Sequence, residues 1–227
     1  MAVFFMAERR ITSLKVQKKN PDRVSIYLDE EFAFGVSRIV AAWLHVGQEL
    51  SEEKIAELQE QETKEAALQK ALLLLSYRPR SEAEIRQKMK TGGFDPEVIT
   101  KVLDRLRETG LVRDESFARE WVENRSAFRP RSRKMLAYEL RQKGVAEEAI
   151  EQALETTSED KDLALQAATR YAHKCSATDW QEFYRRMMSF LARRGFSYET
   201  ANSVVRQVWN GLQSDDGDIR YPDNEEA

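Results

Sequence analysis

The sequence contains little of what would form a disulfide framework, a metal site or a catalytic centre. A single cysteine, Cys175, excludes an internal disulfide and any site made of several thiolates. The two histidines, His45 and His173, have no neighbours at metal-ligand spacing. Cys175 lies two residues after His173, where side chains usually point apart, so we interpret it as a partly buried cysteine. We therefore predict no catalytic residue, no cofactor and no metal, and the chain is not expected to be an enzyme.

Glycine, proline and long apolar runs are also scarce. Only 9 glycines and 5 prolines interrupt the 227 residues, which favours long helices with few tight turns. Gly92-Gly93 lacks the Gly-Lys-Ser/Thr ending of a phosphate-binding loop. The longest apolar run, Ala71–Leu75, is far shorter than the roughly 20 residues of a membrane span. Residues 1–14 lack the pattern of a signal peptide, so we expect a soluble, cytoplasmic chain.

Charge, by contrast, is abundant and unevenly distributed. Charged residues make up 33% of the chain, and the net charge is −3. Seven basic residues against one acid, Glu139, lie from Arg125 to Lys143, and four basic residues without an acid lie from Arg185 to Arg194. Such basic islands attract phosphates or acidic protein surfaces. Residues 213–227 hold six acids and one base, which predicts a disordered tail; alternatively, the tail mimics DNA phosphates and screens the basic repeats.

The first 50 residues are predicted to form a β-hairpin unit. Apolar residues alternate with polar ones over 11–16 and again over 24–28, on either side of a polar turn at 18–23. Residues 32–36 could add a third strand, and a brief helix is predicted over 38–43. Because an isolated hairpin is only marginally stable, we expect this unit to pack on the long helix that follows.

From Ser51 onwards the apolar period becomes helical. Ser51, followed by two acids, predicts a helix start. Further helix starts are predicted at Ser81, Asp95, Asp114 and Ser197. Helix ends are predicted at Gly92-Gly93, Gly110, Gly144 and Gly195. The polar stretch 59–64 leaves two alternatives open, a break in the helix or an exposed helix.

A repeat of 51 residues organises the helical part. Tyr77-Arg78-Pro79-Arg80-Ser81 recurs as Phe128-Arg129-Pro130-Arg131-Ser132. The same shift relates Gly93 to Gly144 and, applied once more, to Gly195. The third copy has lost the Arg-Pro-Arg-Ser element. Three units that share one register predict stacked helical repeats, each made of three helices.

The predicted fold is therefore mainly α, with tandem three-helix repeats in an elongated, curved array and an N-terminal β-hairpin extension. The predicted domains are the hairpin unit (1–50), a linking helix with the first repeat (51–112), the second repeat (113–157), the third repeat (158–212) and a disordered acidic tail (213–227).

Three segments carry a resemblance to a known family: LSYRPRSEAEI (75–85), GLVRDESFAREWVENR (110–125) and ELRQKGV (139–145). In order and spacing they resemble the RecX family, regulators of the bacterial RecA recombinase, over residues 71–156. The hairpin resembles the extension of longer members, and the match fades after residue 157. The resemblance implies a regulator that lies in the groove of the RecA–DNA filament and restrains ATP hydrolysis, strand exchange and thereby DNA repair. It implies the RecA filament as partner, with single- or double-stranded DNA as a further candidate, no membrane and a monomeric state.

The repeated Arg-Pro-Arg-Ser element is the candidate binding site. A proline between two guanidinium groups makes a rigid basic corner, where free backbone N–H groups at a helix start would help to bind a phosphate or carboxylate. The alternative is structural, with arginine stems covering apolar surface and proline ending one helix before the next. Charge density favours binding at Arg129 and Arg131, whereas the two interpretations balance at Arg78 and Arg80. The predicted partner-binding residues are Arg78, Arg80, Arg125, Arg129, Arg131, Arg133, Lys134, Arg141 and Lys143.

Aromatic residues are expected to build the cores of these repeats and not to form stacking platforms, because they fall on apolar helical positions. The residues concerned are Tyr77, Phe94, Phe117, Trp121, Phe128 and Trp209.

A direct DNA-binding protein of the helix-turn-helix type is the competing function. In that case the segment from Arg133 to Lys143 would enter a major groove. DNA binding would weaken steeply with salt, whereas a filament regulator would require RecA, so the two functions can be distinguished.

Overall fold

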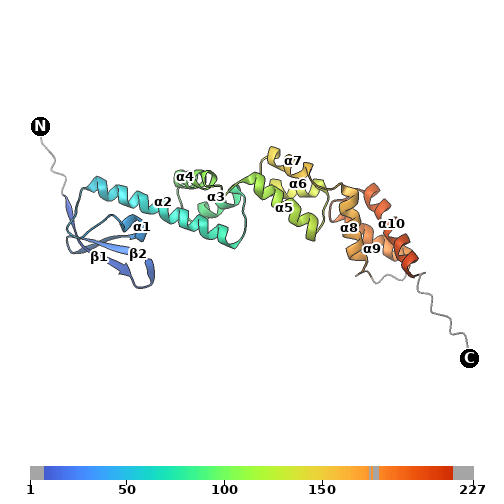
Figure 1. Cartoon of the computed structure of the whole chain (residues 1–227), viewed down its shortest axis with the longest axis horizontal. Helices are drawn as coiled ribbons and strands as arrows, with labels where there is room; N and C mark the ends of the chain where they lie inside the picture. Colours follow the sequence, from blue (N-terminus) through green and yellow to red (C-terminus); the bar gives the residue numbers. More distant parts are fainter. Residues whose placement is uncertain (1–7, 174, 176–178, 217–227) are drawn as a thin grey trace, which may run out of the picture. The chain divides into compact units, whose positions relative to one another are not determined.

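The computed structural model describes residues 8–173, 175 and 179–216. The chain divides into two compact units, Met1–Val112 and Arg113–Ala227 (Figure 1). Within the described residues, no helix combines the length and the apolar character needed to cross a lipid bilayer.

The first unit begins with an antiparallel sheet in the order β3-β2-β1-β4. Its elements are β1 (Arg9–Gln17), β2 (Asn20–Leu28), β3 (Glu31–Ser37), the short helix α1 (Arg38–Ala41) and β4 (Glu49–Leu50). The predicted hairpin and third strand are confirmed, although only Lys18 and Lys19 separate β1 from β2, so the turn is tighter than predicted. β4 has no counterpart in the prediction because two residues cannot display an alternating pattern.

The helix α2 (Glu52–Tyr77) is continuous through the polar stretch 59–64. Glu62 is 9% exposed, and its carboxylate lies 2.8 Å from the Arg23 guanidinium of β2. The same carboxylate accepts a hydrogen bond from the backbone N–H of Ser37, at the end of β3. The stretch is therefore neither broken nor wholly exposed, because a charged side chain holds it to the sheet.

The same helix belongs to two cores. Near its start, Ile55 and Leu58 pack with the apolar residues of the sheet, which confirms that the hairpin unit packs on this helix. Further along, Leu68 and Ala71 pack with α3 (Glu82–Thr91) and α4 (Pro96–Glu108) in the core of the first repeat. Figure 1 shows α2 running from the sheet to these two helices.

Two further three-helix repeats form the second unit. The second repeat contains α5 (Asp114–Phe128), α6 (Arg133–Gln142) and α7 (Glu147–Glu155). The third contains α8 (Asp160–Ala172), α9 (Trp180–Ala192) and α10 (Tyr198–Asp216). Each repeat has its own apolar core, so the predicted mainly helical fold of three-helix repeats is confirmed. α10 reaches Asp216, and the rest of the predicted acidic tail, 217–227, lies outside the described residues.

Four of the five predicted helix caps are confirmed. The hydroxyl oxygens of Ser51, Ser81 and Ser197 each accept a hydrogen bond from the backbone N–H three residues later. The Asp95 carboxylate accepts one from the backbone N–H two residues later. Asp114 is not a cap, because Arg113 occupies the N-cap position of α5 and makes no side-chain capping bond. Asp114 is instead the first helical residue, where a negative charge favours the helix dipole.

Glycines with positive φ end the second helix of each repeat, as predicted. The φ angles are 84° at Gly93, 73° at Gly144 and 86° at Gly195. A Cβ added at Gly93 would meet no atom within 4 Å, whereas at Gly195 it would lie 2.6 Å from Ser132 Oγ and 2.9 Å from Met135 Cβ. The turn of the third repeat therefore packs tightly against the start of α6 in the second repeat.

Gly93→Ala and Gly195→Ala separate the effect of conformation from that of packing. We expect Gly93→Ala to lower the free energy of unfolding by about 1–2 kcal/mol, because a residue with a Cβ is strained at positive φ. Gly195→Ala should lower it by about a further 1–3 kcal/mol, because the added methyl group overlaps Ser132 and Met135. Urea unfolding followed by circular dichroism measures both values, and equal losses would contradict the tight packing at Gly195.

Candidate partner-binding surface

In the first repeat, the Arg-Pro-Arg-Ser corner is bound to its own neighbours. Both terminal guanidinium nitrogens of Arg78 donate to the Glu84 carboxylate at 3.0 Å, and this hydrogen-bonded carboxylate raises the pKa of Arg78. Arg80 Nε donates to the Leu74 carbonyl at 2.9 Å. These contacts fasten the end of α2 to the start of α3, which supports the structural alternative for Arg78 and Arg80.

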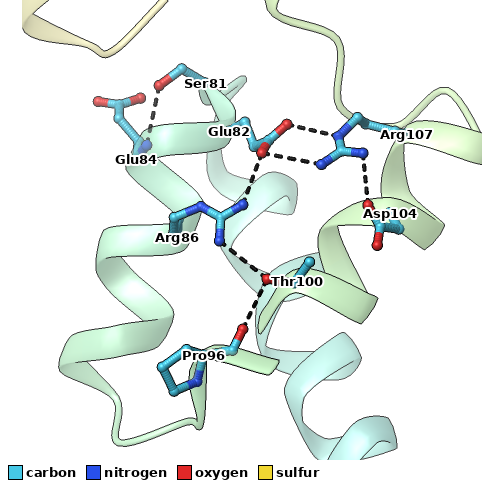
Figure 2. A network of polar contacts seen from close by, with 8 residues as sticks. All are labelled: Ser81, Glu82, Glu84, Arg86, Pro96, Thr100, Asp104 and Arg107. Atoms are coloured by element: carbon cyan, nitrogen blue, oxygen red, sulfur yellow. Dashed lines mark hydrogen bonds and ion pairs between the residues drawn. The ribbon is translucent and has the colours of Figure 1, made fainter. Parts of the chain in front are cut away.

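A second polar network joins α3 to α4 in the same repeat (Figure 2). The Glu82 carboxylate accepts hydrogen bonds from Arg107 at 2.8 Å and from Arg86 at 3.1 Å. Arg107 also donates to Asp104 at 2.7 Å. The Arg107 hydrogen bond, assisted by Arg86, holds the pKa of Glu82 below its usual value. Arg86 and Arg107 are thus neutralised inside the repeat.

Glu82 should make the first unit sensitive to acid. Because its pKa is lower in the folded chain than the ordinary 4.5, its contribution to stability is complete above that value and is lost as the pH falls through the lowered pKa. We expect Glu82→Gln to lower the melting temperature near neutral pH, and this difference from wild type to shrink progressively below pH 4.5. Thermal melts over a pH series measure it, and a difference that does not change with pH would contradict the assignment.

In the second repeat, Glu139 gathers several residues of the predicted site. Its carboxylate accepts hydrogen bonds from Trp121 Nε1 at 2.8 Å, from Arg125 Nε at 2.9 Å and from the Arg131 guanidinium. The Glu139 side chain is only 12% exposed. The one acid among the seven bases therefore pairs with two of them, Arg125 and Arg131, and neutralises part of their charge.

The Trp121 ring brings two of the predicted bases together. The guanidinium carbon of Arg125 and the ammonium of Lys143 each lie 4.3 Å from its centroid, at cation–π distance. Trp121 itself packs against the apolar core of the repeat. Arg125 and Lys143 thus both contact one aromatic residue, whose indole N–H donates to Glu139.

Three backbone N–H groups at the start of α6 are already hydrogen-bonded within the protein. The N–H of Arg133 donates to Asp160 Oδ1 at 2.7 Å, and that of Met135 donates to Ser132 Oγ at 3.2 Å. The N–H of Ser132 donates to the Arg194 carbonyl at 3.1 Å. The Arg133 guanidinium also donates to the Leu154 carbonyl at 2.8 Å. The N–H groups of Ser132, Arg133 and Met135 are therefore bonded within the protein, which leaves fewer N–H groups for an anion here than the sequence suggested.

Arg129 and Lys134 differ from the other predicted bases. Arg141 is exposed but its guanidinium donates twice to Glu147, which raises the pKa of Arg141. Arg129 and Lys134 are both exposed, and neither forms an ion pair with a carboxylate of the described residues. Among the nine predicted residues, these two have charges that remain most available to a partner.

Two aromatic residues predicted to lie in the core are exposed. Tyr77 and Phe128 are each 74% exposed, and each is the last residue of its helix, directly before Arg-Pro-Arg-Ser. The apolar period predicted burial, but the chain turns away at the proline before another helix covers the ring. The other four aromatic residues, Phe94, Phe117, Trp121 and Trp209, pack against the cores as predicted.

Two arginines of this surface belong to the basic island 185–194 but were not among the predicted partner-binding residues. Arg194 donates to the Pro130 carbonyl at 3.0 Å, and Arg193 precedes it in the chain. Burial, with the nearby charges of Arg131, Arg129 and Arg193, lowers the pKa of Arg194. A signal was available, because Lys143 and Arg194 both come directly before the glycine of their repeat.

The cysteine and the candidate metal ligands can also be placed among the described residues. Cys175 is half-buried and packs against the core of the third repeat, in agreement with its interpretation as a structural residue. Among the described residues, no group of three or more histidine, cysteine or acidic side chains is placed to hold a metal ion.

Replacement of Glu139 should reveal its role as a shared counter-ion. We expect Glu139→Ala to lower the free energy of unfolding by about 2 kcal/mol or more, because it leaves the half-buried guanidinium groups of Arg125 and Arg131 without their counter-ion. Glu147→Ala is the matched control, since its ion pair with Arg141 is exposed and should contribute little. Urea unfolding compares the two, and a Glu139→Ala variant as stable as wild type would exclude this role.

Comparison with known domain families gives four matches in chain order. They are the regulatory protein RecX N-terminal domain (residues 9–51) and the RecX first, second and third three-helix domains (residues 67–106, 114–154 and 158–205).

Relatives and solved structures agree with these matches. The regulatory protein RecX of Leuconostoc citreum is 33% identical over 203 residues, which cover 87% of this chain and 75% of the relative. That of Bacillus subtilis is 31% identical over 202 residues, covering 87% and 76%. The crystal structure of a regulatory protein RecX has a TM-score of 0.62 at 27% identity, covering 91% of this chain and 93% of the other. The RecX structure from Lactobacillus salivarius, at 20% identity and a TM-score of 0.55, covers 65% and 97% and supports the fold alone.

Proposed function

Because the chain belongs to the RecX family of regulatory proteins, we propose that it binds the RecA–DNA filament and inhibits ATP hydrolysis and strand exchange by RecA. The observation that carries the proposal is the match of all four domains in order along the chain. In this proposal the chain acts in the cytoplasm as a monomer, and it has no catalytic activity of its own.

The repeated corner supports a partner that is itself repetitive. Tyr77 and Phe128 occupy equivalent positions in two repeats, 51 residues apart, and each is 74% exposed beside an Arg-Pro-Arg-Ser element. Aromatic residues are enriched among those that contribute most to binding at protein interfaces. A filament presents the same surface at regular intervals, so two equivalent rings suit two equivalent places on it.

The nine predicted bases take two different parts in this proposed surface. Arg129 and Lys134, which are exposed and form no ion pair with the described carboxylates, contact the partner directly. The others hold the corners in shape through the contacts described above; they are Arg78, Arg80, Arg125, Arg131, Arg133, Arg141 and Lys143. Because Arg133 and Arg141 are bound within the repeat, insertion of α6 into a major groove is the less favoured function.

The first test is the ATPase activity of RecA on single-stranded DNA, with and without this protein. We expect inhibition at far less than one molecule of the protein per DNA phosphate, because a filament regulator acts on RecA and does not coat the DNA. Unchanged ATP hydrolysis at saturating protein would contradict the proposal.

The second test changes the two exposed rings. We expect Tyr77→Ser with Phe128→Ser to raise the concentration for half-maximal inhibition by at least about tenfold, equivalent to about 1.4 kcal/mol. Folding should change little, because the rings are exposed. Tyr198→Ser is the matched control, since Tyr198 is 71% exposed in the repeat that lacks Arg-Pro-Arg-Ser. Equal effects of the double variant and the control would exclude the rings as the specific contact.

A further inference from the structure

Two basic segments that lie far apart in the sequence meet where the third repeat packs on the second. Arg194 donates to the Pro130 carbonyl at 3.0 Å, and its own carbonyl accepts the N–H of Ser132 at 3.1 Å. Arg129 and Arg131 flank Pro130, and Arg193 precedes Arg194, so four guanidinium groups gather at this junction. The charges of the other three act on Arg194 and contribute to its lowered pKa, which agrees with their closeness.

The described carboxylates leave much of this charge unneutralised. Glu139 binds Arg131, but it also binds Arg125. The partners of Arg194 are neutral, namely the Pro130 carbonyl and the Phe190 ring, whose centroid lies 4.3 Å from the guanidinium carbon. A positive field of this kind, partly desolvated and only partly offset by Glu139, attracts anions.

The two most accessible members of the junction contact no carboxylate among the described residues. The Arg193 guanidinium donates to Ser189 Oγ at 2.7 Å, and Arg193 is exposed. Arg129 is exposed as well, and the structure gives it no ion pair with the described carboxylates. Both guanidinium groups can therefore donate to an external anion without first breaking an ion pair with a described carboxylate.

Helix α9 extends this charge into a row. Arg185, Ser189 and Arg193 follow one another at intervals of four residues, so they share one side of the helix. Arg185 is exposed, whereas the neighbouring Arg186 is paired with Glu182. The helical rise places the Cα atoms of Arg185 and Arg193 about 12 Å apart. Within duplex DNA the phosphates of one strand recur about every 3.4 Å along the helix axis, so the row is long enough to contact more than one phosphate.

We propose that Arg129, Arg193 and Arg185 bind the phosphodiester backbone of a nucleic-acid strand, with Arg194 adding charge at the junction. Contacts of this kind fix the position of a strand and carry no sequence preference. The site needs no RecA, so it is independent of the protein partner proposed above. It also differs from groove insertion of α6, because its residues lie on α9 and on the loop before α6.

Guanidinium chemistry and spacing favour a phosphate chain over an acidic protein surface. The guanidinium fork binds phosphate oxygens in pairs, and an open row of such forks complements a polymer with one charge at every step. An acidic protein surface would need carboxylates at matching intervals. An acidic peptide therefore serves as the competing ligand in the test.

The experiment measures fluorescence anisotropy of a fluorescein-labelled oligothymidylate with the full chain and no RecA, over a series of salt concentrations. We expect Arg129→Ala with Arg193→Ala to weaken binding at least about tenfold at low salt. The slope of log affinity against log salt should fall by about 1.4, or about 0.7 for each phosphate of the single strand that an arginine no longer neutralises. Arg129→Lys with Arg193→Lys keeps the charges and should keep most of the affinity.

The matched control is Arg119→Ala with Arg206→Ala. It removes the same charge from two exposed positions of the same unit that lie outside the junction. We expect it to change affinity by less than about twofold, because exposed charges away from a site contribute little. Unfolding curves of both double variants confirm that the comparison is between folded proteins.

Several results would overturn the proposal. Absence of oligothymidylate binding by the wild-type chain at low salt would contradict the proposal. Equal losses of affinity in the two alanine variants would show that binding depends on diffuse charge and not on this site. Equal losses in the lysine and alanine variants would assign the arginines to the structure of the junction. Weaker binding of a polyglutamate peptide with unchanged binding of the oligothymidylate would assign them to an acidic protein. A failure to inhibit RecA, on its own, would bear on the previous proposal alone, since RecA is absent from this assay.

Discussion

A three-helix repeat is too small to bury a large core, and this limit governs the structure. Small units leave a high fraction of their surface exposed, so their stability depends on what they share with a neighbour. In the first unit a single helix, α2, supplies apolar residues to the sheet core at one end and to the repeat core at the other. In the second unit, Gly195 lies against Ser132, and Arg194 hydrogen-bonds to the loop before α6.

These joints explain why basic residues have more than one role. An arginine stem can cover apolar surface while its guanidinium satisfies a carbonyl at a helix end, as Arg80 does for Leu74 and Arg133 for Leu154. Glu139 then offsets two guanidinium groups in the second repeat. Fewer charged groups are therefore available to a partner than the charge count of the sequence indicates. The available groups are the exposed rings and arginines such as Arg129, which form no ion pair with a described carboxylate.

Local signals predicted the elements well, and non-local contacts explain the differences. Alternation over 24–28 and the caps at Ser51 and Asp95 act within a few residues, so the sequence reveals them directly. The exposure of Tyr77 depends on where the next helix turns, and the burial of Glu62 depends on an arginine in the sheet. The same holds for the binding surface, because Arg193 comes close to Arg129 only through the packing of the third repeat on the loop before α6.

In the third repeat, other residues occupy the position of the Arg-Pro-Arg-Ser element. Residues 180–183 are Trp-Gln-Glu-Phe, and Phe183 is buried in the repeat's own core. The Trp180 ring lies 5.6 Å from that of Trp209 and 5.2 Å from that of Tyr184. In the second repeat, Ser132 of this element lies against Gly195 of the third repeat. In the third repeat, Trp180 and Phe183 pack into the repeat's own core. In the third repeat, the residues at the position of Arg-Pro-Arg-Ser therefore contribute to the core of their own repeat.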